Sequence, residues 1–264
     1  MYSPSSINTY LKNPRLYYYR YILKIPSKPS IHLYKGSLIH EIIENAYKSK
    51  TYINLATQLP LELSFKWKLP QDLILTKKEE KQHYNDAKSI LKQFGQSVER
   101  SIKNIMEDSR IKTKQKAWNS FIPINNEEEI IDTELDLKGI IDAVTPIHEN
   151  GELCIIDYKT SKKINHVFQT DYLRQLILYA ILYERKHKKN IDIVGINYLR
   201  YGETYFFTLT KEQKQDTLKL FEHIKQKTKS TDTNDYPIEG DFFSTKECRE
   251  IEQELKLQVK NDRF

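Results

Sequence analysis

The chain has 264 residues and a mass of 31.4 kDa, a length that suggests one large domain or one domain with a sizeable insert. Hydrophobic residues make up 39% and charged residues 30%, which is typical of a globular protein and excludes a disordered chain. The 42 Lys and Arg residues against 36 Asp and Glu residues give a net charge of +6. This mild excess is compatible with a nucleic-acid partner but does not by itself demand one.

Several further classes are excluded by simple counts. The seven glycines are scattered, whereas a P-loop or a Rossmann turn needs clustered glycines, so a P-loop ATPase, a helicase motor and a usual dinucleotide-binding domain are ruled out. The two cysteines, Cys154 and Cys248, are too few for a disulfide framework or a four-thiolate metal site. No apolar run is long enough to span a membrane, and Met1–Tyr10 lacks the features of a signal peptide. We therefore expect a cytoplasmic protein with no membrane partner.

The N-terminal segment Ser3–Leu23 predicts two short helices. Pro14 suits the first turn of the second helix, with Asn13 as its cap. The basic and aromatic run from Arg15 to Tyr21 predicts a helix end lying on the core, and the alternative is a platform that stacks on unpaired bases.

Two longer helices are expected next. Ser37–Lys48 carries one apolar stripe, and His40 and Glu44 lie beside that stripe, one turn apart. Residues 77–108 show helical spacing of apolar residues behind a capping-box sequence. We expect a helical insert at about 50–110 within a single domain that covers residues 1–264.

Strands follow, and the change of pattern predicts an α/β fold. Asn150–Gly151 is a hairpin turn signal, and the segment after it is apolar on both faces, which marks a central strand. The expected elements, in order, are strands over Ile130–Leu135, Leu137–Ile147 and Leu153–Lys159, a helix over 170–186, a hairpin over 191–209 around Gly202, a helix over 210–229 and a short helix after Ser244.

The chemistry is concentrated on the first hairpin. Asp157 and Lys159 are two residues apart on a strand, so their side chains share a face. If Asn150–Gly151 forms a two-residue turn, Asp142 faces Lys159 and lies diagonal to Asp157. Two carboxylates this close need a cation between them, and Mg²⁺ prefers carboxylate oxygens. The alternative is a structural Asp–Lys ion pair at the end of a strand.

Four motifs occur together in a recognisable order. They are Gly36-x-x-x-His40, Gly139-Ile140-Ile141-Asp142, Asp157-Tyr158-Lys159 and Gln175-x-x-x-Tyr179. This series resembles the motifs of RecB-like nucleases in the PD-(D/E)XK superfamily, over roughly residues 3–250. The resemblance implies a restriction-endonuclease-like core, in which helices flank a central mixed sheet.

The resemblance also implies a role for each motif residue. The expected ligands of Mg²⁺ or Mn²⁺ are His40, Asp142, Asp157 and the backbone carbonyl of Tyr158. The expected catalytic residues are Asp142, Asp157, Lys159, Gln175 and Tyr179. Among them Lys159 would serve the attacking water, and Gln175 and Tyr179 would brace the site or contact the DNA strand.

Some members of this family carry four cysteines for an iron–sulfur cluster, one before a proline near the N-terminus and three near the C-terminus. Here Asn13 stands before Pro14, and Cys248 is the single cysteine of the tail. We therefore expect no iron–sulfur cluster, and expect ordinary packing to hold the two ends together.

The leading hypothesis is a metal-dependent deoxyribonuclease, an exonuclease on single-stranded DNA or DNA ends in repair, recombination or replication. Such a protein would be associated with the nucleoid and could act with a helicase or repair partner. One alternative is a DNA-binding or adaptor module that lost turnover, against which the intact Asp142, Asp157 and Lys159 argue. The other is a structure-specific or restriction-type endonuclease.

Basic residues near the motifs are candidate contacts for the phosphate backbone. Strand alternation would put Lys112, Lys114 and Lys116 on one face, where they could follow a strand of DNA. The remaining candidates are Lys162, Lys163 and Arg174. For any one of these residues, the competing interpretation is a solvated surface.

Overall fold

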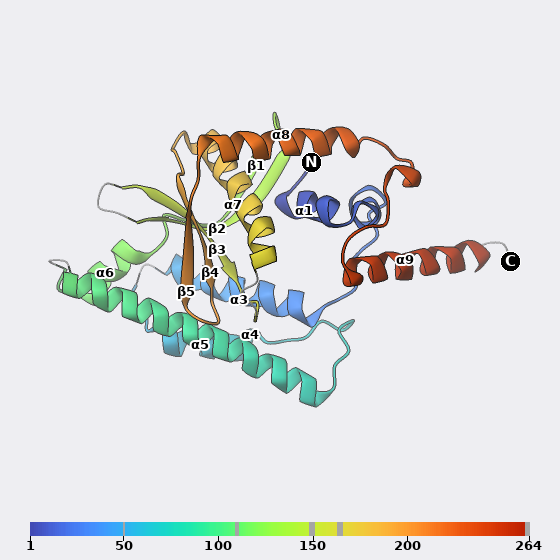
Figure 1. The fold of residues 1–264 in the computed structure, drawn as a ribbon. Coiled ribbons are helices and arrows are strands. Elements are labelled where there is room, and N and C mark those ends of the chain that lie inside the picture. The colour runs from blue at the N-terminus through green and yellow to red at the C-terminus, as the bar shows by residue number, and fades with distance from the viewer. Residues whose placement is uncertain (50, 109–110, 148–150, 163–165, 262–264) are drawn as a thin grey trace. The chain divides into compact units, whose positions relative to one another are not determined.

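The computed structural model describes residues 1–49, 51–108, 111–147, 151–162 and 166–261 (Figure 1). The chain forms two compact units, which we describe separately. The smaller unit contains residues 1–28, 131–139 and 211–264, and the larger unit contains residues 29–130 and 140–210. In the described ranges, no helix combines the length and the apolar character that crossing a membrane requires.

A mixed five-stranded sheet has the order β1-β2-β3-β4-β5, so the expected α/β fold class is confirmed. β3 pairs antiparallel with β2 and parallel with β4, while β4 and β5 form an antiparallel hairpin. Because β3 lies inside the sheet, five of its seven residues are buried, as its apolar sequence predicts. The strands are β1 (Asn125–Asp132), β2 (Leu137–Pro146), β3 (Leu153–Lys159), β4 (Ile193–Tyr198) and β5 (Glu203–Thr208).

Helices of the larger unit contact both faces of this sheet. The parallel strands β3 and β4 are joined by helix α7, which contacts both of them. On the other face, the Tyr158 ring contacts Tyr47 and Phe94. These helices are α3 (Ile31–Lys48), α4 (Leu55–Lys66), α5 (Lys77–Asp108), α6 (Lys114–Phe121) and α7 (His166–His187).

Local sequence explains where the longest helix begins. The Thr76 hydroxyl accepts from the backbone N–H of Glu79, and the Glu79 carboxylate accepts from the backbone N–H of Thr76. This reciprocal pair is the predicted capping box. Buried apolar residues then recur along α5 at helical spacing, including Ile90, Phe94 and Val98.

A helix replaces the strand that the alternating lysines predicted near residue 114. Thr113 caps α6 by accepting from the backbone N–H of Lys116 at 3.3 Å, and Ala117 and Trp118 bury the helix on the core. Lys112, Lys114 and Lys116 therefore do not share one strand face, and the prediction of a lysine row there is wrong. The physical reason is that the Thr113 cap and the burial of Trp118 stabilise a helix here. Exposed lysines at i, i+2 and i+4 favour neither a helix nor a strand.

The smaller unit is built from both ends of the chain. Its helices are α1 (Pro4–Lys12), α2 (Pro14–Tyr17), the π-helix η1 (Tyr18–Ile22), α8 (Lys211–Lys227), the 3₁₀-helix η2 (Thr233–Asp235) and α9 (Phe242–Asn261). As predicted, Asn13 caps the helix that starts at Pro14. The helix expected after Ser244 is longer than predicted, with 20 residues.

Tyrosines fill the core of this unit. Tyr17, Tyr18, Tyr19 and Tyr236 are buried together with Cys248. Tyr17 stacks on Tyr236 with ring centroids 6.4 Å apart. The packing interpretation of the aromatic run is therefore correct, and Tyr17 to Tyr19 are not available to stack on unpaired bases.

The N-terminal and C-terminal segments of the unit are joined by polar contacts. Arg15 donates from Nε to the carbonyl of Tyr236 at 2.6 Å and pairs with Glu252 at 3.0 Å. Asn13 and Cys248, the two positions compared above with cluster cysteines, lie in contact, with Sγ 3.6 Å from Oδ1. Hydrogen bonds, ion pairs and tyrosine packing thus join the two segments here.

Candidate active site and metal centre

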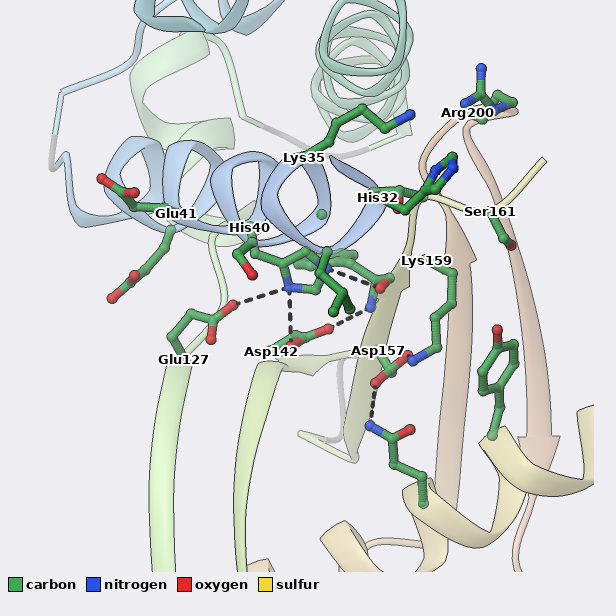
Figure 2. Close-up of a pocket in the computed structure, with 18 of the residues that line it drawn as sticks. His32, Lys35, His40, Glu41, Glu127, Asp142, Asp157, Lys159, Ser161 and Arg200 are labelled. Atoms are coloured by element: carbon green, nitrogen blue, oxygen red, sulfur yellow. Dashed lines mark hydrogen bonds and ion pairs between the residues drawn. The ribbon is translucent and has the colours of Figure 1, made fainter. Parts of the chain in front are cut away.

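A pocket of about 930 Å³ in the larger unit gathers most of the motif residues (Figure 2). His40 enters it from α3, while Asp142 and Asp157 enter it from the neighbouring strands β2 and β3. Lys159 lies at the end of β3, and Gln175 reaches the pocket from α7.

The two aspartates lie on paired strands, but the register differs from the prediction. Ala143 pairs with Ile156, so one residue further along Asp142 comes opposite Asp157 instead of Lys159. The backbone N–H of Ile147 donates to the carbonyl of Glu152, which leaves four connecting residues where two were predicted. Of the predicted turn residues, Gly151 has a positive φ of 79°, and Asn150 lies outside the described residues. A shift of two residues preserves the face, so the three polar side chains still point to one side.

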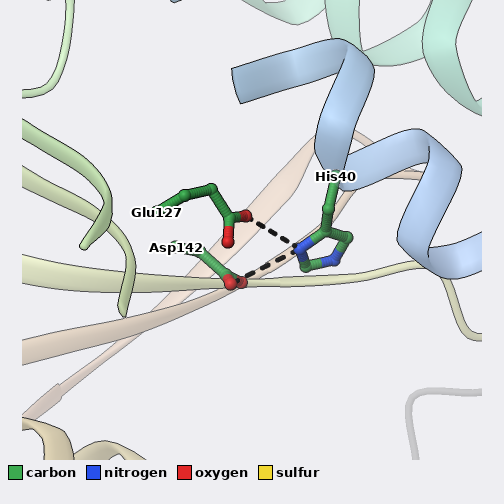
Figure 3. Close-up of side chains that lie close together, drawn as sticks. All are labelled: His40, Glu127 and Asp142. Carbon is green, nitrogen blue, oxygen red and sulfur yellow. Dashed lines mark ion pairs between the residues drawn. The ribbon is translucent and has the colours of Figure 1, made fainter. Parts of the chain in front are cut away.

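His40 stands between two carboxylates (Figure 3). Its Nδ1 atom lies 3.4 Å from Asp142 Oδ1 and 3.4 Å from Glu127 Oε1, and its Nε2 atom lies 3.1 Å from the carbonyl oxygen of Tyr158. Burial alone would lower the pKa of His40, but hydrogen bonds and charge from Asp142 and Glu127 outweigh burial and raise the pKa to about 10. Without a bound metal the two carboxylates therefore favour the protonated imidazole, and a metal bound at Nδ1 would replace that proton.

Glu127 is one of the pocket residues that were not predicted from the sequence. Along β1, Asn126 contacts Glu44 of α3 and Glu127 contacts His40 of α3, whereas Glu128 contacts His187 of α7. Two consecutive residues thus face the same helix, and Glu127 has a positive φ of 48°. Such an irregularity in a strand re-aims a side chain and is frequent beside functional sites.

The sequence around Glu127 contains only a weak indication that this residue belongs to the site. The segment Asn125–Glu129 is wholly polar, so the strand was expected to start at Ile130, where apolar residues begin. β1 lies at an edge of the sheet, where a strand is stabilised by pairing on one side and tolerates polar side chains. Three consecutive glutamates directly before an apolar strand are the feature that could have drawn attention to it.

Asp157 is the most enclosed carboxylate of the site. Only 3% of it is exposed, and burial raises its pKa, with the negative charge of Asp142 adding to the shift and Lys159 opposing it. Its Oδ1 atom accepts from Gln175 at 3.0 Å, and its Oδ2 atom lies 2.6 Å from the Lys159 ammonium. Oδ2 is therefore already paired with a cation, and a metal bound to Asp157 would share this carboxylate with Lys159.

These donors fit a divalent metal. Two or three carboxylates, an imidazole and a backbone carbonyl are the ligand types that Mg²⁺ and Mn²⁺ accept. Oxygen and nitrogen atoms of His40, Glu127 and Asp142 lie within 4.8 Å of one another. The backbone N–H of Tyr158 fixes Asp142 by donating to its Oδ2 atom at 2.6 Å.

The remaining motif residues support the carboxylates. Gln175 also donates to the Tyr179 hydroxyl at 2.8 Å, and burial of Tyr179 raises the pKa of that hydroxyl. Because Tyr179 is only 7% exposed and does not line the pocket, its position suits bracing Gln175 better than touching a substrate. The Lys159 ammonium lies 4.4 Å from the centroid of the Tyr172 ring, an arrangement that restrains it on the pocket side.

The two ends of the pocket differ in charge. Beyond His40 lie the carboxylates of Glu41 and Glu127 (Figure 2). Glu44 also lines the pocket, and Glu41 and Glu44 pair with Lys66 and Lys48. Beyond Lys159 the lining is basic, and its basic residues are His32, Lys35, Lys162 and Arg200. Lys35 and Arg200 both pair with Asp86 of α5.

Of the basic candidates from the sequence, Lys162 lines the basic end of the pocket. Lys163 lies outside the described residues, and Arg174 pairs with Asp171 at 3.0 Å. Lys35 was missed, although it falls in line with Ile39 and Ile42 on the buried stripe of α3. A charged residue on an apolar stripe is a sign that it has a partner or a purpose.

Comparisons with known proteins identify the family of the chain. The family model of the PD-(D/E)XK nuclease superfamily matches residues 1–256, so the chain belongs to that superfamily. Among solved structures, the chain is similar to a candidate exonuclease from Eubacterium rectale. The TM-score is 0.46 at 14% sequence identity, with 85% of this chain and 78% of that chain covered. A search of curated proteins finds no match.

Proposed function

We propose that this chain is a metal-dependent DNA exonuclease of the RecB-like branch, which hydrolyses phosphodiester bonds at strand ends. The observation that carries the proposal is a single pocket that holds a set of metal donors and a lysine and whose two ends differ in charge. The spacing of Gly36 to His40 and of Gln175 to Tyr179 supports the RecB-like assignment. Such an activity suits repair, recombination or replication, alone or beside a helicase.

Each residue of the site has its own role in the proposed reaction. His40, Asp142, Asp157 and the carbonyl of Tyr158 would hold Mg²⁺ or Mn²⁺, with Glu127 in reach; a bound ion of this kind activates water and offsets phosphate charge. Gln175 keeps Asp157 oriented by donating to one of its oxygens. The Lys159 ammonium, held by Asp157 and Tyr172, stabilises the negative charge that grows on the phosphate.

The charge difference between the two ends supports cutting at a strand end. Phosphates are attracted to the side that carries Lys35, Lys162 and Arg200. On the other side, Glu41 and Glu44 pair with Lys66 and Lys48, so that end offers phosphates no surplus of positive charge. A strand therefore binds with its phosphates on one side of the metal centre and with little chain beyond it, which is the situation of an exonuclease.

The deciding experiment compares linear and circular DNA. Purified protein is incubated with end-labelled linear and with circular single-stranded DNA of the same sequence, in Mg²⁺, Mn²⁺ or EDTA. We expect cleavage of the linear strand with either metal, little change in the circle, and no cleavage in EDTA. Equal cleavage of the circle would make the chain an endonuclease, and binding without cleavage in any metal would make it a DNA-binding module.

A further inference from the structure

The outward face of α5 carries a row of lysines outside the pocket. Lys81, Lys88 and Lys92 are exposed and lie at intervals of seven and four residues, so they project from the same side of the helix; we call them the α5 lysine row. Lys103, exposed as well, extends this side of the helix but pairs with Glu107 at 3.4 Å. From Lys81 to Lys103 the helix rises about 33 Å, at 1.5 Å per residue.

The acidic residues of the same segment point elsewhere. Between Lys81 and Lys103 they are Asp86 and Glu99, both partly buried. Asp86 pairs with Lys35 and Arg200, and Glu99 accepts from the hydroxyl of Tyr52 at 2.6 Å. The outward side is therefore positive from Lys81 to Lys92.

The middle of α8 looks different. There Lys219 pairs with Asp216 at 3.0 Å and Lys225 pairs with Glu222 at 3.1 Å, so charges of both signs alternate. No carboxylate in the described part of the chain forms an ion pair with a lysine of the α5 row. Unpaired positive charges along one line repel one another unless an anion follows the same line.

We propose that the α5 lysine row binds the phosphate backbone of a DNA duplex that adjoins the strand end held in the pocket. This inference rests on the proposed nuclease function and adds its substrate class, a duplex with a single-stranded end. On the opposite side of α5 from the row, Asp86 pairs with Lys35 and Arg200 of the pocket lining, so the row and the basic end of the pocket flank the same helix. The thickness of one helix, about 10 Å, separates the two surfaces, and this is roughly three base pairs of duplex.

Paired DNA fits this face better than unpaired bases. Proteins that hold single strands combine positive charge with aromatic rings on which the bases stack. The aromatic side chains of α5 in this segment are Tyr84 and Phe94. Phe94 is 2% exposed, and the ring of Tyr84 packs against Trp67 with centroids 5.4 Å apart. A face with lysines and without an available ring suits a backbone whose bases are already stacked in a duplex.

The test measures binding to two DNA molecules in EDTA, where the proposed cleavage is blocked. One is a duplex with a single-stranded tail, and the other is a single strand with the sequence of the tail. For the triple variant Lys81→Ala, Lys88→Ala, Lys92→Ala, we expect at least a tenfold loss of affinity for the tailed duplex. We also expect its plot of log affinity against log salt to flatten by roughly 2–3, at about 0.9 per phosphate contact. Affinity for the single strand should stay unchanged.

The matched control removes three exposed lysines from α8, Lys211, Lys219 and Lys227, and should leave both affinities at the wild-type level. Equal losses for both DNA molecules would overturn the inference and make the row a contact for single strands. Wild-type affinity and salt dependence in the triple variant would show a solvated face. Because the readout is binding, a wild-type protein that cuts no DNA would defeat the proposed function without deciding this inference.

Discussion

Lys159 is the residue at which a structural and a catalytic role can be separated most cleanly. Its ammonium lies 2.6 Å from a buried oxygen of Asp157 and faces the pocket beside Tyr172. We predict that Lys159→Ala lowers the rate of DNA cleavage by roughly 10²–10³, because it removes one group that stabilises transition-state charge. DNA binding and the folded state should remain. Lys219→Ala, at an exposed lysine of α8, serves as the control. Wild-type rates in Lys159→Ala would leave Lys159 as an ion-pair partner only.

Glu127 and Glu128 offer a matched pair on one strand. They are adjacent, but Glu127 faces His40 whereas Glu128 faces His187. We predict that Glu127→Gln weakens Mn²⁺ binding roughly 10- to 100-fold, the usual effect of losing a group that holds or orients a metal. Glu128→Gln should bind Mn²⁺ like the wild type, and calorimetric titration of both variants decides the matter. Equal affinities in the two variants would remove Glu127 from the metal centre.

How much of the site the sequence could predict depends on how local each signal is. Asp157 and Lys159 share a face by strand geometry alone, and His40 lies beside an apolar helical stripe. The register of β2 against β3 depended on the length of one connection, and Glu127 depended on an irregularity in an edge strand. Neither feature produces a periodic pattern in the sequence, because each depends on the packing of distant segments.

The segment directly before α9 packs closely against the end of α1. Gly240 has a φ of 101°, and a Cβ atom there would collide with the carbonyl of Lys12. We predict that Gly240→Ala destabilises the smaller unit by roughly 1–3 kcal/mol, since it adds a strained backbone to a steric clash. Gly151→Ala is the control, because its φ is also positive while nothing lies within 4 Å of the added atom. Urea unfolding should show the larger loss for Gly240→Ala, and equal losses would mean that backbone strain alone matters.

Asp241 makes the stability of the same junction depend on pH. A hydrogen-bonded ion pair with Lys12 and a hydrogen bond from the backbone N–H of Ser244 lower the pKa of Asp241 from 3.8 to about 2. A carboxyl group with a lowered pKa in the folded state stabilises the fold above its unfolded pKa, and the contribution is lost as pH falls through the folded pKa. We predict that Asp241→Asn is less stable than the wild type at pH 5–7. The difference should shrink between about pH 4 and pH 2, as followed by thermal unfolding, and a constant difference would contradict the assignment.

The order of elements along the whole chain was largely predictable. The capping box of α5, the Asn13 cap, the apolar β3 and the hairpin around Gly202 each carry their own local signal. α6 and the length of α9 were not predicted, because burial of Trp118 and contacts such as Arg15 with Glu252 decide them from a distance. Both terminal segments belong to the smaller unit, and no local sequence pattern predicts that they pack together.

Metal binding should change amide hydrogen exchange in the larger unit but not in the smaller one. The candidate ligands are His40, Glu127, Asp142, Asp157 and the carbonyl of Tyr158, and all of them belong to the larger unit. A ligand that binds only the folded state stabilises it by RT ln(1 + [L]/Kd), which is about 2.7 kcal/mol at a hundred times Kd. We predict that Mn²⁺ slows amide hydrogen exchange in α3, β1, β2 and β3, and that EDTA reverses the effect.

The smaller unit provides the internal reference for that measurement. α1 and α9 contain none of the candidate ligands, so their exchange should be the same with Mn²⁺ and with EDTA. Asp142→Asn should abolish the protection in the larger unit, because Asp142 contacts both His40 and the backbone N–H of Tyr158. Equal protection in both units would indicate that the metal acts on the chain as a whole. Protection that survives in Asp142→Asn would place the ion elsewhere, and the four motifs would then share a pocket without sharing a metal.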